Sequence, residues 1–366
     1  MGLRNKIYQL IPILTYITRN NKLKNRFSFI IQILFSKECH IKFNNNINFV
    51  IESYDYPTIL HILSLERYSQ IFRSDDDKII ISFDRINQFY ISSKKLTRED
   101  KVLLDLLDFG VKEGAIFIDK EHSVPFKNDK IIKIIQEKRS IVETSEGVRF
   151  YLDISGAIVE AFIRRIHDQY SNDLSNKVVI DIGASVGDTP LYFASKGATV
   201  YAFEMTKTNF DGMLENLKLN PELSKKIFPV NCAVGKDEEV TYTQDSRDLF
   251  SADGGASFVT NKYGQNSKEQ KVQGMTIKTI LKKYNISNIE LLKLDCKGCE
   301  FFLTKEDLQI VKRLKIEYYS HFKSHSIQSI VELLRNLNFK VVFFKHNTLD
   351  ITEFERHGNL YAERDK

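Results

Sequence analysis

From about residue 139 onward, short runs rich in β-branched and aromatic residues alternate with stretches of helical periodicity. This alternation is typical of a mostly parallel sheet whose two faces are covered by helices. The tail at 358–365 follows the last run so closely that we expect it to return antiparallel, as the seventh strand. The other predicted strands are KVVIDIG (177–183), ATVYAFE (198–204), FPVNCAVG (228–235), IELLKLD (289–295), LKIEYYS (314–320) and FKVVFFK (339–345).

The first part of the chain lacks this rhythm and carries no recognisable catalytic spacing. Residues 1–138 are therefore predicted to form an N-terminal α/β accessory domain, and residues 139–366 a second domain. Two apolar stretches, IYQLIPILTYI (7–17) and FSFIIQILF (27–35), are too short to span a bilayer. Because they flank a basic segment, peripheral contact with a membrane surface is one interpretation. Burial of the apolar faces on the domain itself is the favoured one.

The charge and cysteine content narrow the class of protein. The net charge of +5 is spread over 53 basic residues interleaved with 48 acidic ones, which argues against a nucleic-acid partner. Four cysteines without a secretory leader are not expected to form a disulfide framework, so we expect a reducing, cytoplasmic setting. Cys296 and Cys299 form a C-x-x-C that could be a redox pair or half of a metal site. Packing as free thiols is favoured, with no metal, because no second pair completes a zinc site.

A glycine turn follows the first strand of the second domain. Gly183 and Gly187 let the backbone bend sharply and approach a ligand closely. The adjacent Asp181 would repel the phosphates of a dinucleotide but attract the sulfonium and ammonium of S-adenosylmethionine. Glu204 ends the next strand, where a carboxylate can accept hydrogen bonds from both ribose hydroxyls. The turn and its two acids therefore predict a site for S-adenosylmethionine.

Two other interpretations of this turn remain open. It could be an ordinary strand-turn-helix junction with Asp181 as a helix cap. The sequence GASVG also fits the G-x-S-x-G elbow of α/β-hydrolases, with Ser185 as nucleophile followed by Asp295 and His321 in the required order. A hydrolase has no use for Glu204 at the end of the second strand, which favours the cofactor site.

With these motifs in place, the sequence resembles the FkbM family of S-adenosylmethionine-dependent methyltransferases over roughly residues 140–345. DIGASVGDTPLYFASKGATVYAFE resembles the first two cofactor motifs of the family, and NCAVG (231–235) its third strand. The stretch ending in DCKGCEF resembles the Asp-x-Glu-Gly-x-Glu signature of the family. The resemblance implies a Rossmann-like class I methyltransferase domain, and an O-methyltransferase acting on a sugar, glycan or related small metabolite.

The resemblance also implies roles for single residues. The methionine end of the cofactor pocket would be shaped by Asp181, Gly183, Ala184 and Gly187; Glu204 would hold the ribose; Asn231 and Ala233 would border the adenine. The catalytic candidates are Asp295 and Glu300, which would face the methyl group and the acceptor, and His321 after the next strand. Methyl transfer to a hydroxyl requires alignment and removal of one proton, so a carboxylate or an imidazole suits this place.

One departure from the family pattern keeps a non-enzymatic alternative open. Lys297 stands where the family usually has glutamate, which reverses the charge beside the expected acceptor site. A methyltransferase fold retained as a binding or scaffolding subunit is therefore the second hypothesis.

Overall fold

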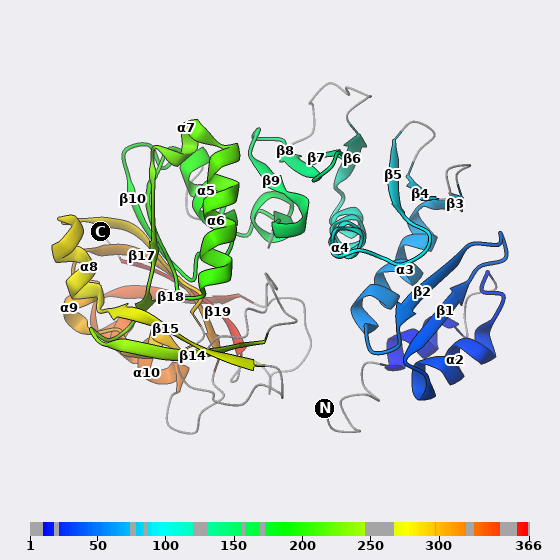
Figure 1. The fold of residues 1–366 in the computed structure, drawn as a ribbon. Coiled ribbons are helices and arrows are strands. Elements are labelled where there is room, and N and C mark those ends of the chain that lie inside the picture. The colour runs from blue at the N-terminus through cyan, green and yellow to red at the C-terminus, as the bar shows by residue number, and fades with distance from the viewer. Residues whose placement is uncertain are drawn as a thin grey trace. The chain divides into compact units, whose positions relative to one another are not determined.

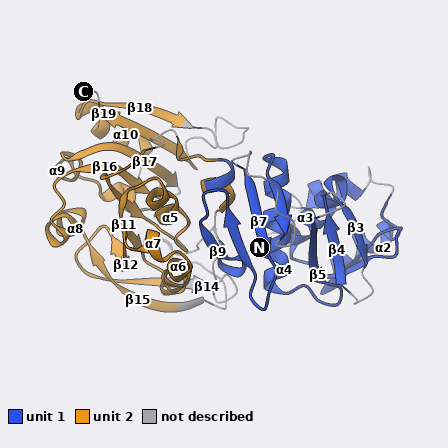
Figure 2. Cartoon of the chain, turned by 90° about the horizontal axis from the view of Figure 1, so that it is seen from above, with its two compact units in different colours: residues 1–155, 162–164 blue, residues 156–161, 165–366 orange. Residues whose placement is uncertain are grey.

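The computed structural model describes most of the chain in two compact units, which Figure 2 distinguishes by colour. Unit 1 comprises residues 1–155 and 162–164, and unit 2 comprises residues 156–161 and 165–366. The described residues are 10–17, 22–73, 78–83, 87–119, 130–155, 158–168, 173–245, 267–296, 298–319, 326–344 and 357–364.

Unit 1 combines helices with three small sheets, of orders β1-β2, β3-β4-β5 and β6-β7-β8-β9. Polar side chains set the helix starts: Asp55 caps α3, and Thr97 forms a reciprocal capping box with Asp100 at α4. The helices are α2 (Arg26–Phe35), α3 (Tyr56–Tyr68) and α4 (Arg98–Lys112), with the short turn η1 (Leu152–Ile154). The short helix η2 (Val159–Ile163) is divided between the two units. The strands are β1 (Glu38–Lys42), β2 (Asn48–Glu52), β3 (Gln70–Arg73), β4 (Lys78–Ser82), β5 (Gln88–Ser92), β6 (Ile116–Asp119), β7 (Ile131–Ile135), β8 (Ile141–Thr144) and β9 (Arg149–Tyr151).

The last sheet of unit 1 contains the position at which we expected the domains to divide. β8 and β9 continue the sheet that β6 and β7 begin, with antiparallel pairing of β7 to β8 and of β8 to β9. The compact unit consequently extends to residue 155, beyond the predicted boundary at 138. β8 and β9 belong to unit 1 because β8 hydrogen-bonds to β7 and β9 to β8. The change in sequence pattern near residue 139 therefore does not mark the boundary between the units.

Unit 2 is built on a seven-stranded sheet of order β12-β11-β10-β16-β17-β19-β18 (Figure 1). Its strands are β10 (Val178–Ile182), β11 (Thr199–Glu204), β12 (Ile227–Asn231), β16 (Ile289–Leu294), β17 (Val311–Tyr319), β18 (Phe339–Phe344) and β19 (His357–Arg364). The helices are α5 (Asp188–Ser195), α6 (Lys207–Leu219), α7 (Pro221–Ser224), α8 (Ile277–Tyr284), η4 (Cys299–Phe302), α9 (Lys305–Leu308) and α10 (Ile327–Asn336).

The pairing confirms the predicted mostly parallel sheet. β12, β11, β10, β16 and β17 are parallel neighbours, and β19 runs antiparallel to both β17 and β18. The chain builds outward from β10 through β11 to β12 and then returns to place β16 on the other side of β10. Ligands of such sheets bind where the strand order reverses, so the carboxyl ends of β10 and β16 mark the site.

The predicted strand FPVNCAVG is divided in the structure. Its first half is β12 of the large sheet, and its second half is β13 (Ala233–Val234), which pairs with β15 (Ser267–Met275). β15 also pairs antiparallel with β14 (Glu239–Asp245), which gives a separate three-stranded sheet. The division is a tertiary effect, because the two halves find different partner strands.

The two faces of the large sheet differ in polarity. Side chains alternate between faces along each strand. One face is apolar and packs against α8 and α10. The opposite face carries a row of charged side chains on three adjacent strands, since the register places Asp181 of β10 beside Lys293 of β16, and Lys293 beside Lys315 of β17.

Candidate active site

The glycine turn after β10 has a backbone that few residues other than glycine can adopt. Gly183, Ser185 and Gly187 have φ angles of 80°, 47° and 89°, and Gly187 caps the start of α5. A Cβ atom on Gly183 would lie 1.9 Å from the backbone oxygen of Asp295, which follows β16. The turn therefore packs directly against the end of β16. The predicted cofactor turn and the first catalytic candidate are adjacent.

Glu204 lies beside this turn at the end of β11. Its Oε2 accepts a hydrogen bond of 2.9 Å from the backbone N–H of Ser185, and its Oε1 accepts one of 2.8 Å from the N–H of Thr206. Burial raises the pKa of Glu204, although the hydrogen bonds from Thr206 and Ser185 act in the opposite direction. A carboxylate held against a glycine turn at a strand end fits the ribose of S-adenosylmethionine.

Asn231 and Ala233 support the same strand end from the next strands. The side-chain amide of Asn231 donates to the backbone oxygens of Glu204 and Met205, at 2.8 and 3.0 Å. Ala233, in β13, is buried. The structure thus gives Asn231 a defined positioning contact, and contact of these two residues with adenine stays a prediction.

Asp181 is placed differently from what the sequence led us to expect. Its carboxylate is fully buried, pairs with Nζ of Lys293 at 2.8 Å and accepts a hydrogen bond of 2.5 Å from the hydroxyl of Thr189. The carboxylate is therefore already neutralised inside the unit and does not offer a charge to a ligand at the surface of the turn. The cause is Lys293, which lies opposite Asp181 in the sheet register.

Lys293 is the site residue that the sequence reasoning missed. Its Nζ also lies 3.2 Å from the backbone oxygen of Gly183, so one buried ammonium binds both the strand and the turn. Burial opposes the charge, but Asp181 and Asp295 outweigh burial and raise the pKa of Lys293 above its usual value. A lysine inside the apolar run IELLKL was the available signal, because an unpaired charge is not tolerated in a buried strand.

A second lysine extends the polar row across the sheet. Burial, together with the neighbouring Lys293, lowers the pKa of Lys315 to about 8. Its Nζ lies 3.5 Å from Nδ1 of His167, which is itself buried. Asp188, at the start of α5, interacts electrostatically with this polar row. Burial is the main influence on the pKa of Asp188, which Lys293 lowers and Asp181 raises.

Asp188 gives a testable pH dependence. Burial raises the pKa of Asp188 from 3.8 to about 7. A carboxyl group with a raised folded-state pKa contributes stability that is full below its unfolded pKa and lost as the pH rises through the folded value. We expect the free energy of unfolding of the wild type, relative to that of Asp188→Asn, to fall by about 1.4 kcal/mol per pH unit between about pH 5 and 6.5. Urea unfolding of both proteins at several pH values measures this, and parallel pH profiles would contradict it.

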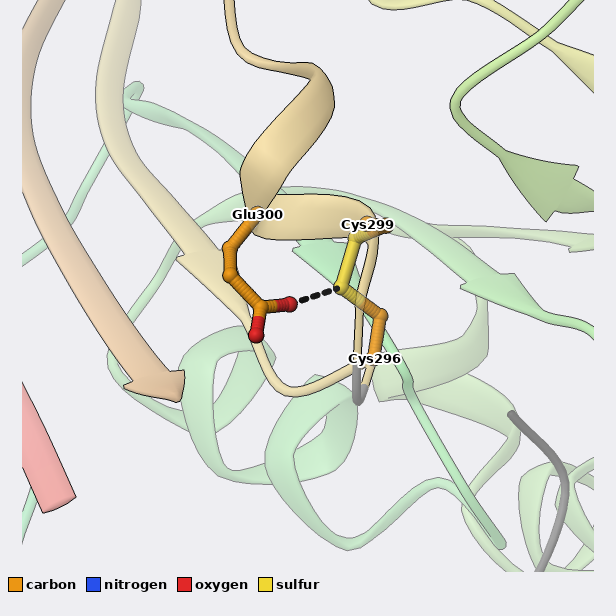
Figure 3. Close-up of side chains that lie close together, drawn as sticks. All are labelled: Cys296, Cys299 and Glu300. Carbon is orange, nitrogen blue, oxygen red and sulfur yellow. Dashed lines mark hydrogen bonds between the residues drawn. A yellow bond between two sulfur atoms is a disulfide. The ribbon is translucent and has the colours of Figure 1, made fainter. Parts of the chain in front are cut away.

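The loop after β16 is closed by a disulfide between Cys296 and Cys299, whose Cα atoms are 5.5 Å apart (Figure 3). The expectation that these cysteines pack as free thiols is therefore wrong: the tight loop into η4 brings the two sulfurs together. Figure 3 shows the carboxylate of Glu300 directed at this bridge, with Oε2 3.6 Å from Sγ of Cys296. The same oxygen accepts a 2.7 Å hydrogen bond from the N–H of Gly298.

The catalytic candidates are thus separated by the structure. Glu300 is fully buried in its own loop, where its contacts stabilise the loop, while Asp295 is half-buried at the end of β16 beside Gly183. His321 and Lys297 lie outside the described residues. Of the two catalytic candidates that the structure describes, Asp295 is the one that is not fully buried.

Comparison with known proteins agrees with this geometry. Residues 181–341 match the family model described as the Methyltransferase FkbM domain, so this part of the chain is a methyltransferase domain with S-adenosylmethionine as its cofactor. The match favours methyl transfer over the hydrolase interpretation of GASVG. No curated protein matches the sequence significantly.

Three solved structures of methyltransferases are similar to this chain at low sequence identity. An rRNA methylase from Streptococcus thermophilus is 13% identical over 55% of this chain and 96% of its own, with a TM-score of 0.34. A SAM-dependent methyltransferase from Agrobacterium tumefaciens is 12% identical over 81% of this chain and 90% of its own, with a TM-score of 0.35. A precorrin-6y C5,15-methyltransferase from Geobacter metallireducens is 10% identical over 56% of this chain and 88% of its own, with a TM-score of 0.34.

Proposed function

We propose that this FkbM-domain methyltransferase methylates a hydroxyl oxygen of a sugar, glycan or related small metabolite. The observation that carries the proposal is the direct packing of the glycine turn, beside which Glu204 lies, against Asp295. One short edge of the sheet thereby combines a place for the ribose with a carboxylate that can accept a proton.

The residues of the chain would hold the cofactor as follows. The turn formed by Gly183, Ala184 and Gly187 would border its methionine end, Glu204 would accept hydrogen bonds from the ribose, and Asn231 with Ala233 would border the adenine. When bound, S-adenosylmethionine supplies an electrophilic methyl group on a sulfonium.

Asp295 is the proposed general base. An acceptor hydroxyl must lose one proton as its oxygen becomes bonded to the methyl carbon, and a carboxylate within hydrogen-bond reach can take that proton. The remaining rate enhancement comes from alignment of the acceptor oxygen with the methyl group of the cofactor. The close contact between Gly183 and the end of β16 supports this alignment. Asp181 and Lys293 act here as positioning residues, because they hold the turn without facing the acceptor.

Asp295→Asn tests the proposal. We expect consumption of S-adenosylmethionine in the presence of fractionated glycan and metabolite extracts to fall about 10²- to 10⁴-fold, because the amide cannot take the proton. Affinity for S-adenosylhomocysteine should remain within about threefold of wild type, because the charge removed does not contact the ribose. Turnover is measured with methyl-labelled cofactor.

Glu222→Gln, an exposed change in α7, is the matched control and should keep wild-type turnover. Unchanged turnover in Asp295→Asn would remove Asp295 as the base. Tight cofactor binding by the wild type, with no product from any extract, would instead support a binding or scaffolding subunit.

A further inference from the structure

Helix α2 exposes an apolar face in unit 1. Phe27, Ile31, Leu34 and Phe35 are 85%, 58%, 51% and 82% exposed. Their spacing of four, three and one residues places them along one side of the helix. Contiguous exposed apolar surface of this kind marks an interaction site more often than isolated exposed residues do.

The helix is firmly attached by its other side. Phe29 and Ile33 are buried, and the amide of Asn25, at the helix start, donates to the backbone oxygen of His40 at 2.8 Å. The side chain of Gln32 accepts a 2.9 Å hydrogen bond from the N–H of His40. The favoured expectation of burial therefore holds for one side only, and the outer face is a fixed feature of the folded unit.

The chain segment that contains α2 carries charge of one sign up to Lys37. The first 37 residues contain seven Lys and Arg and no Asp or Glu, whereas the remaining residues contain 46 basic and 48 acidic ones. The net positive charge of the chain is therefore concentrated in this segment, and is not spread along the chain as we expected from the totals. Lys24 and Lys37 are exposed and lie two residues before and two residues after α2.

An apolar face flanked by basic residues matches an anionic lipid surface. Aromatic and aliphatic side chains enter the boundary between headgroups and acyl chains, while lysines attract anionic headgroups. A second copy of the chain is a poor occupant, because the two basic segments would repel each other across the interface. No described helix is long and apolar enough to cross a bilayer, so the expected mode is attachment to the surface.

We propose that α2 attaches the protein to the surface of an anionic membrane, with Phe27, Ile31, Leu34 and Phe35 inserted and Lys24 and Lys37 at the headgroups. The ten residues of α2 lie in the plane of the surface, because their apolar side runs the length of the helix. This role is independent of the methyl-transfer reaction and is measured without it.

Vesicle flotation of the full chain tests the proposal. The wild type should float with vesicles of phosphatidylcholine and phosphatidylglycerol, bind pure phosphatidylcholine at least about tenfold more weakly, and dissociate as salt increases. The double variant Phe27→Ser/Phe35→Ser should lose binding about tenfold or more. Both side chains are exposed in the folded unit, so the variant should keep the circular dichroism spectrum and melting temperature of the wild type.

Two controls separate the contributions. Tyr68→Ser removes an exposed aromatic ring from α3 and should bind as the wild type does, and Lys24→Glu/Lys37→Glu should lose the preference for phosphatidylglycerol. Equal binding by wild type and Phe27→Ser/Phe35→Ser would overturn the proposal. So would a wild-type dimer in light scattering that the same double variant dissociates, since the face would then serve self-association.

Discussion

Replacing Lys293 by methionine is expected to lower the free energy of unfolding by about 3–5 kcal/mol, because it leaves the buried carboxylate of Asp181 without its partner. Methionine has a similar length and supplies apolar packing, so the loss reports the charge and not the volume. The change also removes the 3.2 Å contact with the backbone oxygen of Gly183 and should loosen the turn. Urea unfolding followed by circular dichroism measures the effect.

Two comparisons make this prediction specific. Lys293→Met/Asp181→Asn removes both charges and should recover much of the lost stability, since a neutral pair avoids the cost of an isolated buried charge. Lys312→Met breaks a partly exposed pair with Glu290 on the neighbouring strand and should cost less than about 1 kcal/mol. A Lys293→Met protein as stable as Lys312→Met would show that Asp181 does not depend on Lys293.

Glu204→Gln is expected to weaken binding of S-adenosylhomocysteine about 100-fold. A carboxylate can accept from both ribose hydroxyls, and charge-assisted hydrogen bonds of this kind contribute about 1.5–3 kcal/mol each. In the wild type, the N–H groups of Ser185 and Thr206 both donate to the Glu204 carboxylate. The glutamine side chain keeps one acceptor oxygen, and its NH2 group would face one of these two N–H groups. Isothermal titration calorimetry measures the affinity.

The control for Glu204→Gln is Asp211→Asn, an exposed carboxylate in α6 that should bind the ligand as the wild type does. The melting temperatures of both variants show whether the fold is retained. If Glu204→Gln bound S-adenosylhomocysteine with wild-type affinity, the assignment of Glu204 to the ribose would be wrong.

The disulfide and the polar row change how the site is understood. Glu300 looked like a second catalytic carboxylate from its place in the signature sequence, but its oxygen is held by Gly298 within the bridged loop. Asp181 looked like a ligand for a cationic cofactor, but Lys293 already neutralises it. The electrostatic attraction that suggested the cofactor site therefore does not come from Asp181, and Glu204 with the glycine turn carries that assignment.

The sequence by itself determined which segments form the strands of the large sheet and where the glycine turn lies. Apolar runs with few charges predict buried parallel strands, because both faces of such strands are covered. Glycines predict backbone with positive φ, because residues with a Cβ atom are sterically disfavoured there. Glu204 could be placed at the end of β11 for the same reason. These features need no knowledge of which strands become neighbours.

Only the tertiary structure decided which groups meet. Lys293 reaches Asp181 across 112 residues because β16 inserts beside β10, and β8 and β9 belong to unit 1 because they pair with β7. The exposure of Phe27 and Phe35 likewise depends on which side of α2 the rest of unit 1 covers. Strand neighbours and covered faces follow from the packing of distant segments, and local sequence carries no record of them.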